Sequence, residues 1–228
     1  MKDYILTIDT ETATFDHSKG VYGCNALTYD IGVAVCDRLG NIYETLNFVV
    51  EEIFQGEYKR MKTSYYANKL PQYFVEIGEG VRSLVSFDEA RAQILDLMRK
   101  YNIKKVAAYN TSFDYYALKK TNSFLNKKWY FFPKDTQYID IMKMAKQIFS
   151  KNRNYVKFCK ANNYLTEKGR PQIKAETVYR YISKDTDFVE AHTGLKDVEI
   201  ETAIMGYLNK RKKKLVREIA FKHWRLFQ

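Results

Sequence analysis

Two acidic residues, Asp9 and Glu11, directly follow the apolar run at residues 4–8. Side chains alternate between the two faces of a strand, so an extended segment would present both carboxylates on one side. Two like charges held this close repel each other, and one of them would take up a proton unless another group compensates. A metal ion or a shared proton is therefore the expected reason for this pair.

Three more polar side chains stand where they could join this pair. Asp114 follows residues 104–110, which are expected to form a strand buried on both faces, and α/β sheets bind ligands at the ends of such strands. Late in the chain, His192 precedes Asp197 by five residues. On one helix these two would lie about 140° apart. We therefore expect Thr193 to cap the last helix and His192 to lie in the loop before it.

The elements that would position these side chains follow an α/β pattern. Residues 4–9, 30–37 and 44–52 are typical of strands, and the turn at 38–41 joins the last two, which predicts an antiparallel meander. Further strands are expected at 104–110 and 129–132, and helices at 86–101, 114–120, 140–149, 154–162, 174–182 and 195–214. The predicted fold class is α/β, with a mixed sheet of three antiparallel strands followed by parallel strands and flanked by helices.

Several polar residues have a structural explanation. Ser86 and Glu89 form a capping box at the start of a helix. Asp140 directly precedes another helix and is expected to be its cap. Glu201 lies one turn beyond Asp197 on the same helix face, where it could join the acidic group, but we expect it to be a solvated side chain.

Length and composition fit one domain. A chain of 228 residues with 46% hydrophobic residues can bury a full core, and 3 Pro and 10 Gly leave no long linker. We expect a domain over residues 1–209 and a basic helical extension over 210–228. The 3 cysteines show no paired spacing, which fits a reducing compartment, and no apolar run is long enough to span a membrane. A cytoplasmic protein without a membrane partner is expected.

The net charge of +11 and the pI near 9.3 favour a phosphate-bearing partner, although such a charge can also serve solubility. Aromatic residues make up 15% of the chain and could stack on bases, but most are expected in the core. Candidates for a phosphate-binding track are Arg153, Lys157, Lys160, Lys168, Arg170 and Lys174.

The sequence segments IDTET (8–12), NTSFD (110–114) and HTGLKD (192–197) resemble, in this order, the three motifs of the DEDDh class of 3′→5′ exonucleases. Each motif alone is short, but each stands at an expected strand end or helix start, and together they are specific. The resemblance covers residues 4 to about 208. The branch of the class that uses Tyr would have it at Thr193, so the histidine at position 192 indicates the His branch.

The resemblance implies a ribonuclease H-like fold and hydrolysis of phosphodiester bonds with two divalent cations, Mg²⁺ or Mn²⁺. The implied metal ligands are Asp9, Glu11, Asp114 and Asp197, with Asp9 bridging both ions. His192 would act as the general base that takes the proton from the attacking water. The implied substrate-binding residues are Thr10, Thr12, Asn110 and Phe113.

The activity implied by the resemblance is the release of mononucleotides from the 3′ end of single-stranded or frayed DNA. An RNA-trimming exoribonuclease of the same class would share every residue named above. A catalytically silent nucleic-acid-binding module with the same fold is the alternative from another class, although binding alone would not require these acids and His192. The expected partner is a nucleic acid with a single-stranded 3′ end, DNA favoured over RNA. A homodimer is also compatible with the family.

Overall fold

The computed structural model describes residues 3–13, 26–64 and 66–211. The expected domain boundary at residue 209 falls within the last described helix, Gly194–Arg211. From position 212 onward, the expected basic extension lies outside the described residues, as does Cys24. None of the helices in the described part of the chain is long and apolar enough to cross a membrane.

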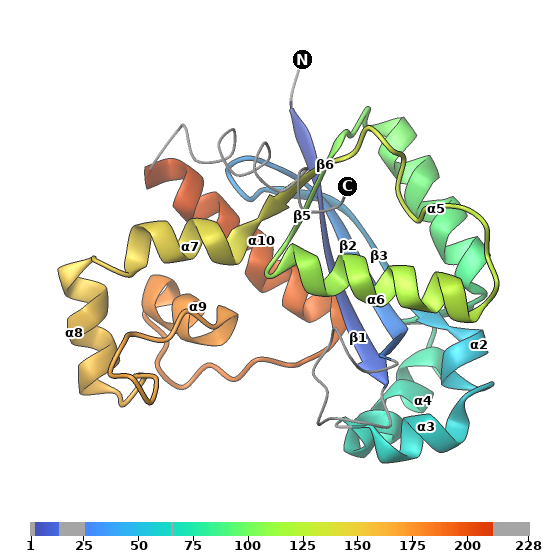
Figure 1. Cartoon of the computed structure of the whole chain (residues 1–228), viewed down its shortest axis with the longest axis horizontal. Coiled ribbons are helices and arrows are strands. Elements are labelled where there is room, and N and C mark those ends of the chain that lie inside the picture. The colour runs from blue at the N-terminus through green and yellow to red at the C-terminus, as the bar shows by residue number, and fades with distance from the viewer. Residues whose placement is uncertain (1–2, 14–25, 65, 212–228) are drawn as a thin grey trace.

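A six-stranded mixed sheet forms the centre of the protein (Figure 1), with the strand order β4-β3-β2-β1-β5-β6. The strands are β1 (Tyr4–Ala13), β2 (Leu27–Asp37), β3 (Ile42–Val50), β4 (Ser83–Val85), β5 (Lys105–Ala108) and β6 (Gln137–Asp140). The first three are antiparallel neighbours, whereas β4 pairs with β3, β5 with β1 and β6 with β5 in parallel. The predicted order of three antiparallel strands followed by parallel strands is confirmed.

Helices cover both faces of this sheet. On one face lie α5 and α6 with the short helices α2 to α4, and on the other lie α7 to α10 (Figure 1). The helices are α2 (Glu51–Phe54), α3 (Tyr58–Thr63), α4 (Leu70–Gly78), α5 (Phe87–Lys100), α6 (Thr111–Phe124), α7 (Ile141–Phe149), α8 (Arg153–Ala161), α9 (Ala175–Ser183) and α10 (Gly194–Arg211), with a 3₁₀ turn at Ala67–Lys69. Two hydrophobic cores result, one on each side of the sheet.

Two of the three predicted side-chain caps are present. The Ser86 hydroxyl accepts a hydrogen bond from the Glu89 N–H at 3.2 Å, at the start of α5. The Asp140 carboxylate accepts one from the Lys143 N–H at 2.8 Å, at the start of α7. Both caps depend on residues three apart in the chain, which is why the sequence alone predicts them.

The predicted strand at 129–132 is wrong, because this segment runs as a loop and the sheet continues in β6 instead. Trp129 stacks on Phe87 of α5 with ring centroids 5.9 Å apart, and Phe131 packs against the same ring at 5.3 Å. Aromatic residues have a high strand propensity because they pack well on a half-buried surface. Here the same packing is achieved without strand pairing. The three-residue strand β4 was not predicted.

Helix α10 lies directly against the backbone of the sheet and the β2–β3 turn. A Cβ atom on Gly32 of β2 would lie 2.1 Å from the carbonyl carbon of Gly194, and one on Gly206 would lie 2.2 Å from the Leu39 carbonyl oxygen. Between these two contacts, the hydroxyls of Thr7 and Thr202 are 2.6 Å apart. Any larger side chain at the two glycines would push α10 away from β1 and β2.

Replacement of Gly32 by alanine should therefore destabilise the protein by about 1–3 kcal/mol, the usual range for overpacking in a core. The measurement is urea unfolding of the Gly32→Ala variant followed by circular dichroism. Gly78→Ala is the matched control, since a Cβ at Gly78 would meet nothing within 4 Å. Equal stability of the two variants would contradict the close packing of α10.

Candidate active site

Strand β1 carries Asp9 and Glu11 toward the face that α10 covers. Thr7, two residues earlier on the same face, contacts Thr202 of α10. In the pairing of β1 with β2, Asp9 lies opposite Gly32, and the register shifts just after Glu11. The structure therefore places the two acids side by side, at the carboxyl end of the strand and facing α10.

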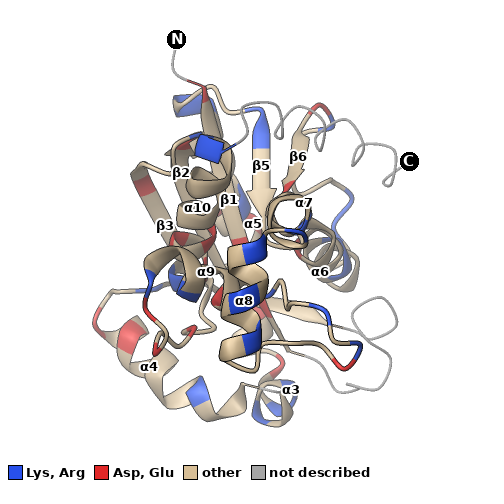
Figure 2. Ribbon diagram, turned by 90° about the vertical axis from the view of Figure 1, so that its left-hand side faces the viewer, with Lys and Arg blue, Asp and Glu red and all other residues tan. Residues whose placement is uncertain are grey.

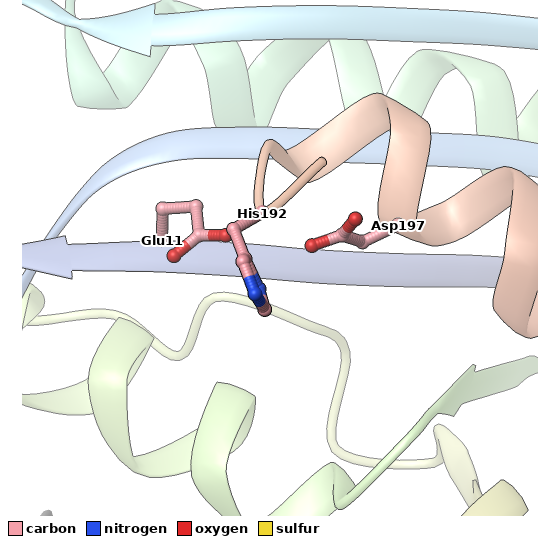
Figure 3. A group of neighbouring side chains, drawn as sticks. All are labelled: Glu11, His192 and Asp197. Carbon is pink, nitrogen blue, oxygen red and sulfur yellow. The ribbon is translucent and has the colours of Figure 1, made fainter. Parts of the chain in front are cut away.

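A second contribution comes from the loop before α10 and its first turn. Glu11, His192 and Asp197 each offer a ligand atom, and these atoms lie within 4.8 Å of one another. Figure 3 shows Glu11 extending from β1 and Asp197 from α10, with the His192 side chain between them. The loop placement expected for His192 is thus observed, and it brings the imidazole and the Asp197 carboxylate to the same place.

Asp114 joins from the first turn of α6. Its Oδ1 accepts hydrogen bonds from the backbone N–H of Thr10 at 3.0 Å and from the Thr10 hydroxyl at 2.9 Å. Thr10 is one of the implied substrate-binding residues, but in this structure its N–H and its hydroxyl both hold Asp114. Thr10 therefore supports an acid of the site rather than offering a free donor.

Glu201 is a fifth acid of this group, and the expectation of a solvated side chain is wrong. The residue is only 4% exposed, and its Oε2 accepts a hydrogen bond from the Tyr109 N–H at 3.1 Å. It is also the carboxylate that most strongly raises the pKa of Asp9. The available signal was its position one turn after Asp197 on the inner face of α10.

Burial and mutual repulsion raise the pKa values of these acids. Burial and Asp197 raise the pKa of Glu11 to about 8, and burial and Glu190 raise that of Asp197 to about 8. Burial also raises the pKa of Asp114 to about 7, although the Thr10 hydrogen bonds oppose this shift. For Asp9, burial and then Glu201 raise the pKa well above its usual value. A bound cation would compensate the negative charge of these carboxylates and favour their ionised form.

The donor set fits divalent cations. Carboxylate oxygens are the ligands that Mg²⁺ and Mn²⁺ prefer, and four of the acids here were the expected ligands. Among the described residues, Asp197 Oδ1 is buried and has no hydrogen-bond partner. A buried carboxylate oxygen without a donor is costly unless a cation satisfies it. The residues present are therefore able to hold the implied ions.

Contacts from the α3–α4 region hold His192 in place. The imidazole stacks on Tyr66 with ring centroids 5.0 Å apart and an angle of 23° between the planes. The Lys69 ammonium donates to the carbonyl of His192 at 3.0 Å and to that of Ala191. Burial and the Lys69 charge lower the pKa of His192. The imidazole is thereby kept neutral, the form that accepts a proton.

The start of α10 is capped by a residue from the neighbouring strand instead of by Thr193. Asp30 of β2 accepts a hydrogen bond from the Gly194 N–H at 2.9 Å, and it also accepts from Tyr73 at 2.5 Å and Arg82 at 2.8 Å. The Thr193 hydroxyl is buried without a partner among the described residues. The predicted Thr193 cap is wrong because its hydroxyl accepts no N–H of the helix, whereas Asp30 accepts that of Gly194.

The remaining expected substrate-binding residues lie close in sequence to the acids of the site. Asn110 occupies the cap position of α6 with a φ of +109°, and its side chain makes no capping hydrogen bond. Phe113 and Thr12 are half-buried. A nucleotide-binding role for these three residues stays a prediction.

The metal-free protein should lose stability as the pH rises from about 5 to about 8. A carboxyl with a raised folded-state pKa stabilises the protein fully below its unfolded pKa, and this stabilisation disappears as the pH rises through the folded value. Ordinary unfolded values near 4 and folded values of about 7 to about 8 for Asp114, Glu11 and Asp197 define that window. Thermal unfolding in chelator at the two pH values measures the effect, and added Mn²⁺ should raise the melting temperature most at the higher pH.

An Asp9→Asn variant is the control for this experiment. Removal of one charge from the group should reduce the loss of stability at high pH, because the remaining acids repel less. A metal-free wild type that is more stable at the higher pH than at the lower would contradict the charge crowding described above.

The fold is identified by comparison with solved structures. Neither a family model nor a curated protein sequence matches the chain. Among solved structures, the nuclease domain of 3′hExo, a DEDDh family member bound to rAMP, matches with a TM-score of 0.60 at 13% identity, over 94% of this chain and 95% of that one. A 3′-exonuclease that recognises a histone mRNA stem-loop matches with a TM-score of 0.61 at 14% identity, over 94% and 66% of the two chains.

A third similar structure is the zinc-bound form of E. coli exonuclease I in complex with single-stranded DNA. It matches with a TM-score of 0.55 at 14% identity, over 96% of this chain and 43% of that one. The three matches cover 94% to 96% of this chain, which confirms the fold expected from the three motifs. The chain described here has the ribonuclease H-like fold of the DEDDh 3′-exonucleases.

Proposed function

We propose that this protein is a 3′→5′ exonuclease that uses divalent cations to hydrolyse phosphodiester bonds. The observation that carries the proposal is the convergence of Asp9, Glu11, Asp114, Asp197 and His192 at one end of β1. Their motifs occur in the order that the class uses, and the fold is the one on which the class is built. A binding module would have no use for acids whose mutual repulsion raises their pKa values.

Each residue of the site has a distinct proposed role. Asp9, Glu11 and Asp197 would hold one cation, and Asp114 together with Asp9 would hold the second. Bound at these residues, the ions would activate a water molecule and stabilise the charge on the leaving oxygen. Neutral His192 accepts the proton of the attacking water. Thr10 keeps the Asp114 carboxylate in place through two hydrogen bonds.

The proposed substrate is the 3′ end of a single strand, with DNA favoured. Structural neighbours include a complex with single-stranded DNA, one with rAMP and one with a stem-loop RNA. RNA trimming is therefore the second candidate, since the same acids serve both chemistries. The two candidate substrates, DNA and RNA, differ in the sugar of the terminal nucleotide. Parallel assays on a DNA strand and the matching RNA strand measure which of them is preferred.

Replacement of Asp9 by asparagine or of His192 by asparagine should abolish most of the activity. For His192→Asn we expect a fall of about 10²- to 10⁴-fold in kcat, the usual contribution of a general base, with strand binding retained. The assay follows 5′-labelled single-stranded DNA and the matching RNA on gels, with Mg²⁺ or Mn²⁺ and with chelator. A ladder that shortens from the 3′ end is the expected wild-type product.

The control variant is Asp96→Asn, because Asp96 is an exposed acid of α5 paired with Arg99. It should cleave as the wild type does. If the wild type leaves both strands intact but binds them tightly, the silent binding module replaces the nuclease as the better account of this fold.

Basic side chains on the α7–α10 face give the strand a path for its phosphates. Lysine and arginine residues line α8 (Figure 2), and Arg153, Lys157 and Lys160 are exposed at helical spacing. Lys174 occupies the N-cap position of α9, and its charge contributes to the lowered pKa of His192, after burial and Lys69. We propose that these side chains bind phosphates of the bound strand.

Charge reversal tests this path. Lys157→Glu should weaken the binding of single-stranded DNA and reduce the slope of log K against log salt by about one, because one phosphate contact is lost. Lys104→Glu is the matched control, since Lys104 is exposed beside the opposite end of β5. Equal effects of the two reversals would show that net charge, rather than a path over α8, governs binding.

A further inference from the structure

A cavity lies outside the acidic group, between α6 and the loop that precedes β6. Its volume is about 320 Å³. The residues that line it are Tyr115, Leu118, Lys119, Asn122, Tyr130, Phe131, Phe132, Pro133, Lys134 and Tyr138. Nothing in the proposed mechanism uses this cavity, which we call the α6 pocket.

The α6 pocket combines flat aromatic walls with positive charge. Its lining contains five aromatic side chains and two lysines, Lys119 and Lys134, and no carboxylate. Tyr130 is 60% exposed, and the Lys134 ammonium lies 5.7 Å from the centroid of its ring. Stacking surfaces beside cations are what proteins use to bind single-stranded nucleic acid.

The loop that forms one wall is fixed before any ligand binds. The Arg91 guanidinium lies 4.3 Å from the Trp129 ring centroid, and its Nε donates to the carbonyls of Tyr130 at 3.1 Å and Phe131 at 2.9 Å. Asn122 of α6 donates to the Trp129 carbonyl. Because these contacts already order the loop, a ligand would not have to supply the free energy for doing so.

The α6 side of the pocket begins at the residue that follows Asp114 in the sequence. Tyr115 directly follows Asp114, and the lining residues of α6 extend from Tyr115 to Asn122, about 10 Å along the helix. We propose that the α6 pocket binds an unpaired base of the substrate strand, upstream of the nucleotide being removed. This proposal rests on the nuclease function proposed above and names the single-stranded feature that the enzyme would recognise.

A strand fits these features better than a free mononucleotide does. Sites for nucleotide phosphates usually surround them with backbone N–H groups from a helix N-terminus or a glycine-rich loop. The lining contains no glycine, and its α6 residues follow the first turn of the helix. Two lysines at the surface instead attract a chain of phosphates, and only an unpaired base can leave its stack to lie against the rings.

The test is strand binding by full-length protein carrying Asp9→Asn, which should bind without cleaving. Fluorescence anisotropy would compare a labelled dodecanucleotide with a trinucleotide of DNA, before and after Tyr130→Ala is added. We expect the dodecanucleotide to bind about 5- to 150-fold more weakly, the range for one lost stacking contact, and the trinucleotide to bind as before. In the active background, KM for the longer strand should rise while kcat stays constant.

Tyr43→Ala is the matched control, because Tyr43 is also a surface tyrosine, 39% exposed, on β3. It should change neither affinity. Equal weakening of both oligonucleotides by Tyr130→Ala, or no weakening of either, would overturn the proposal. Competition by dAMP for the dodecanucleotide that Tyr130→Ala abolishes would also overturn it, in favour of a mononucleotide site. Tyr130-dependent binding without any cleavage by the wild type would refute the nuclease function and leave the strand site standing.

Discussion

The crowding of five carboxylates at one end of β1 is the constraint on which the site depends. Asp9 and Glu11 come from the strand, Asp114 from α6, and Asp197 and Glu201 from α10. Three elements distant in sequence thus bring like charges together in a region where burial raises their pKa values. Such an arrangement is stable at neutral pH only when protons or cations compensate the charge, so the binding of cations here would be linked to folding.

Close packing of α10 on the sheet holds two of these carboxylates in place. Gly32 and Gly194 let two backbones approach to a distance that no side chain would permit. Asp30, itself neutralised in part by Arg82, then accepts the first N–H of the helix. Packing and capping therefore set the position of Asp197 and Glu201 through the body of the helix rather than through flexible side chains.

Local patterns predicted most of the elements and the order of the motifs, because strand alternation, capping and helical spacing act between residues close in sequence. The predictions that were wrong involve contacts between residues distant in sequence. The cap on α10 joins Asp30 to a residue 164 positions later. The burial of Glu201 depends on Tyr109 of another segment, and the packing of Trp129 depends on Phe87. No single window of sequence contains those pairs. The predictions therefore depended on local propensity, which tertiary contacts override in the folded protein.

The placement of His192 shows the same principle at the level of one residue. Its φ of +48° is a conformation that non-glycine residues rarely adopt, and surrounding contacts must hold it there. Lys69 binds two carbonyls of the loop, Tyr66 stacks on the ring, and Asp30 fixes the next turn through Gly194. These contacts come from outside the three motifs. The motifs therefore contain the proposed reacting groups, whereas the α3–α4 region and β2 determine where the proposed general base lies.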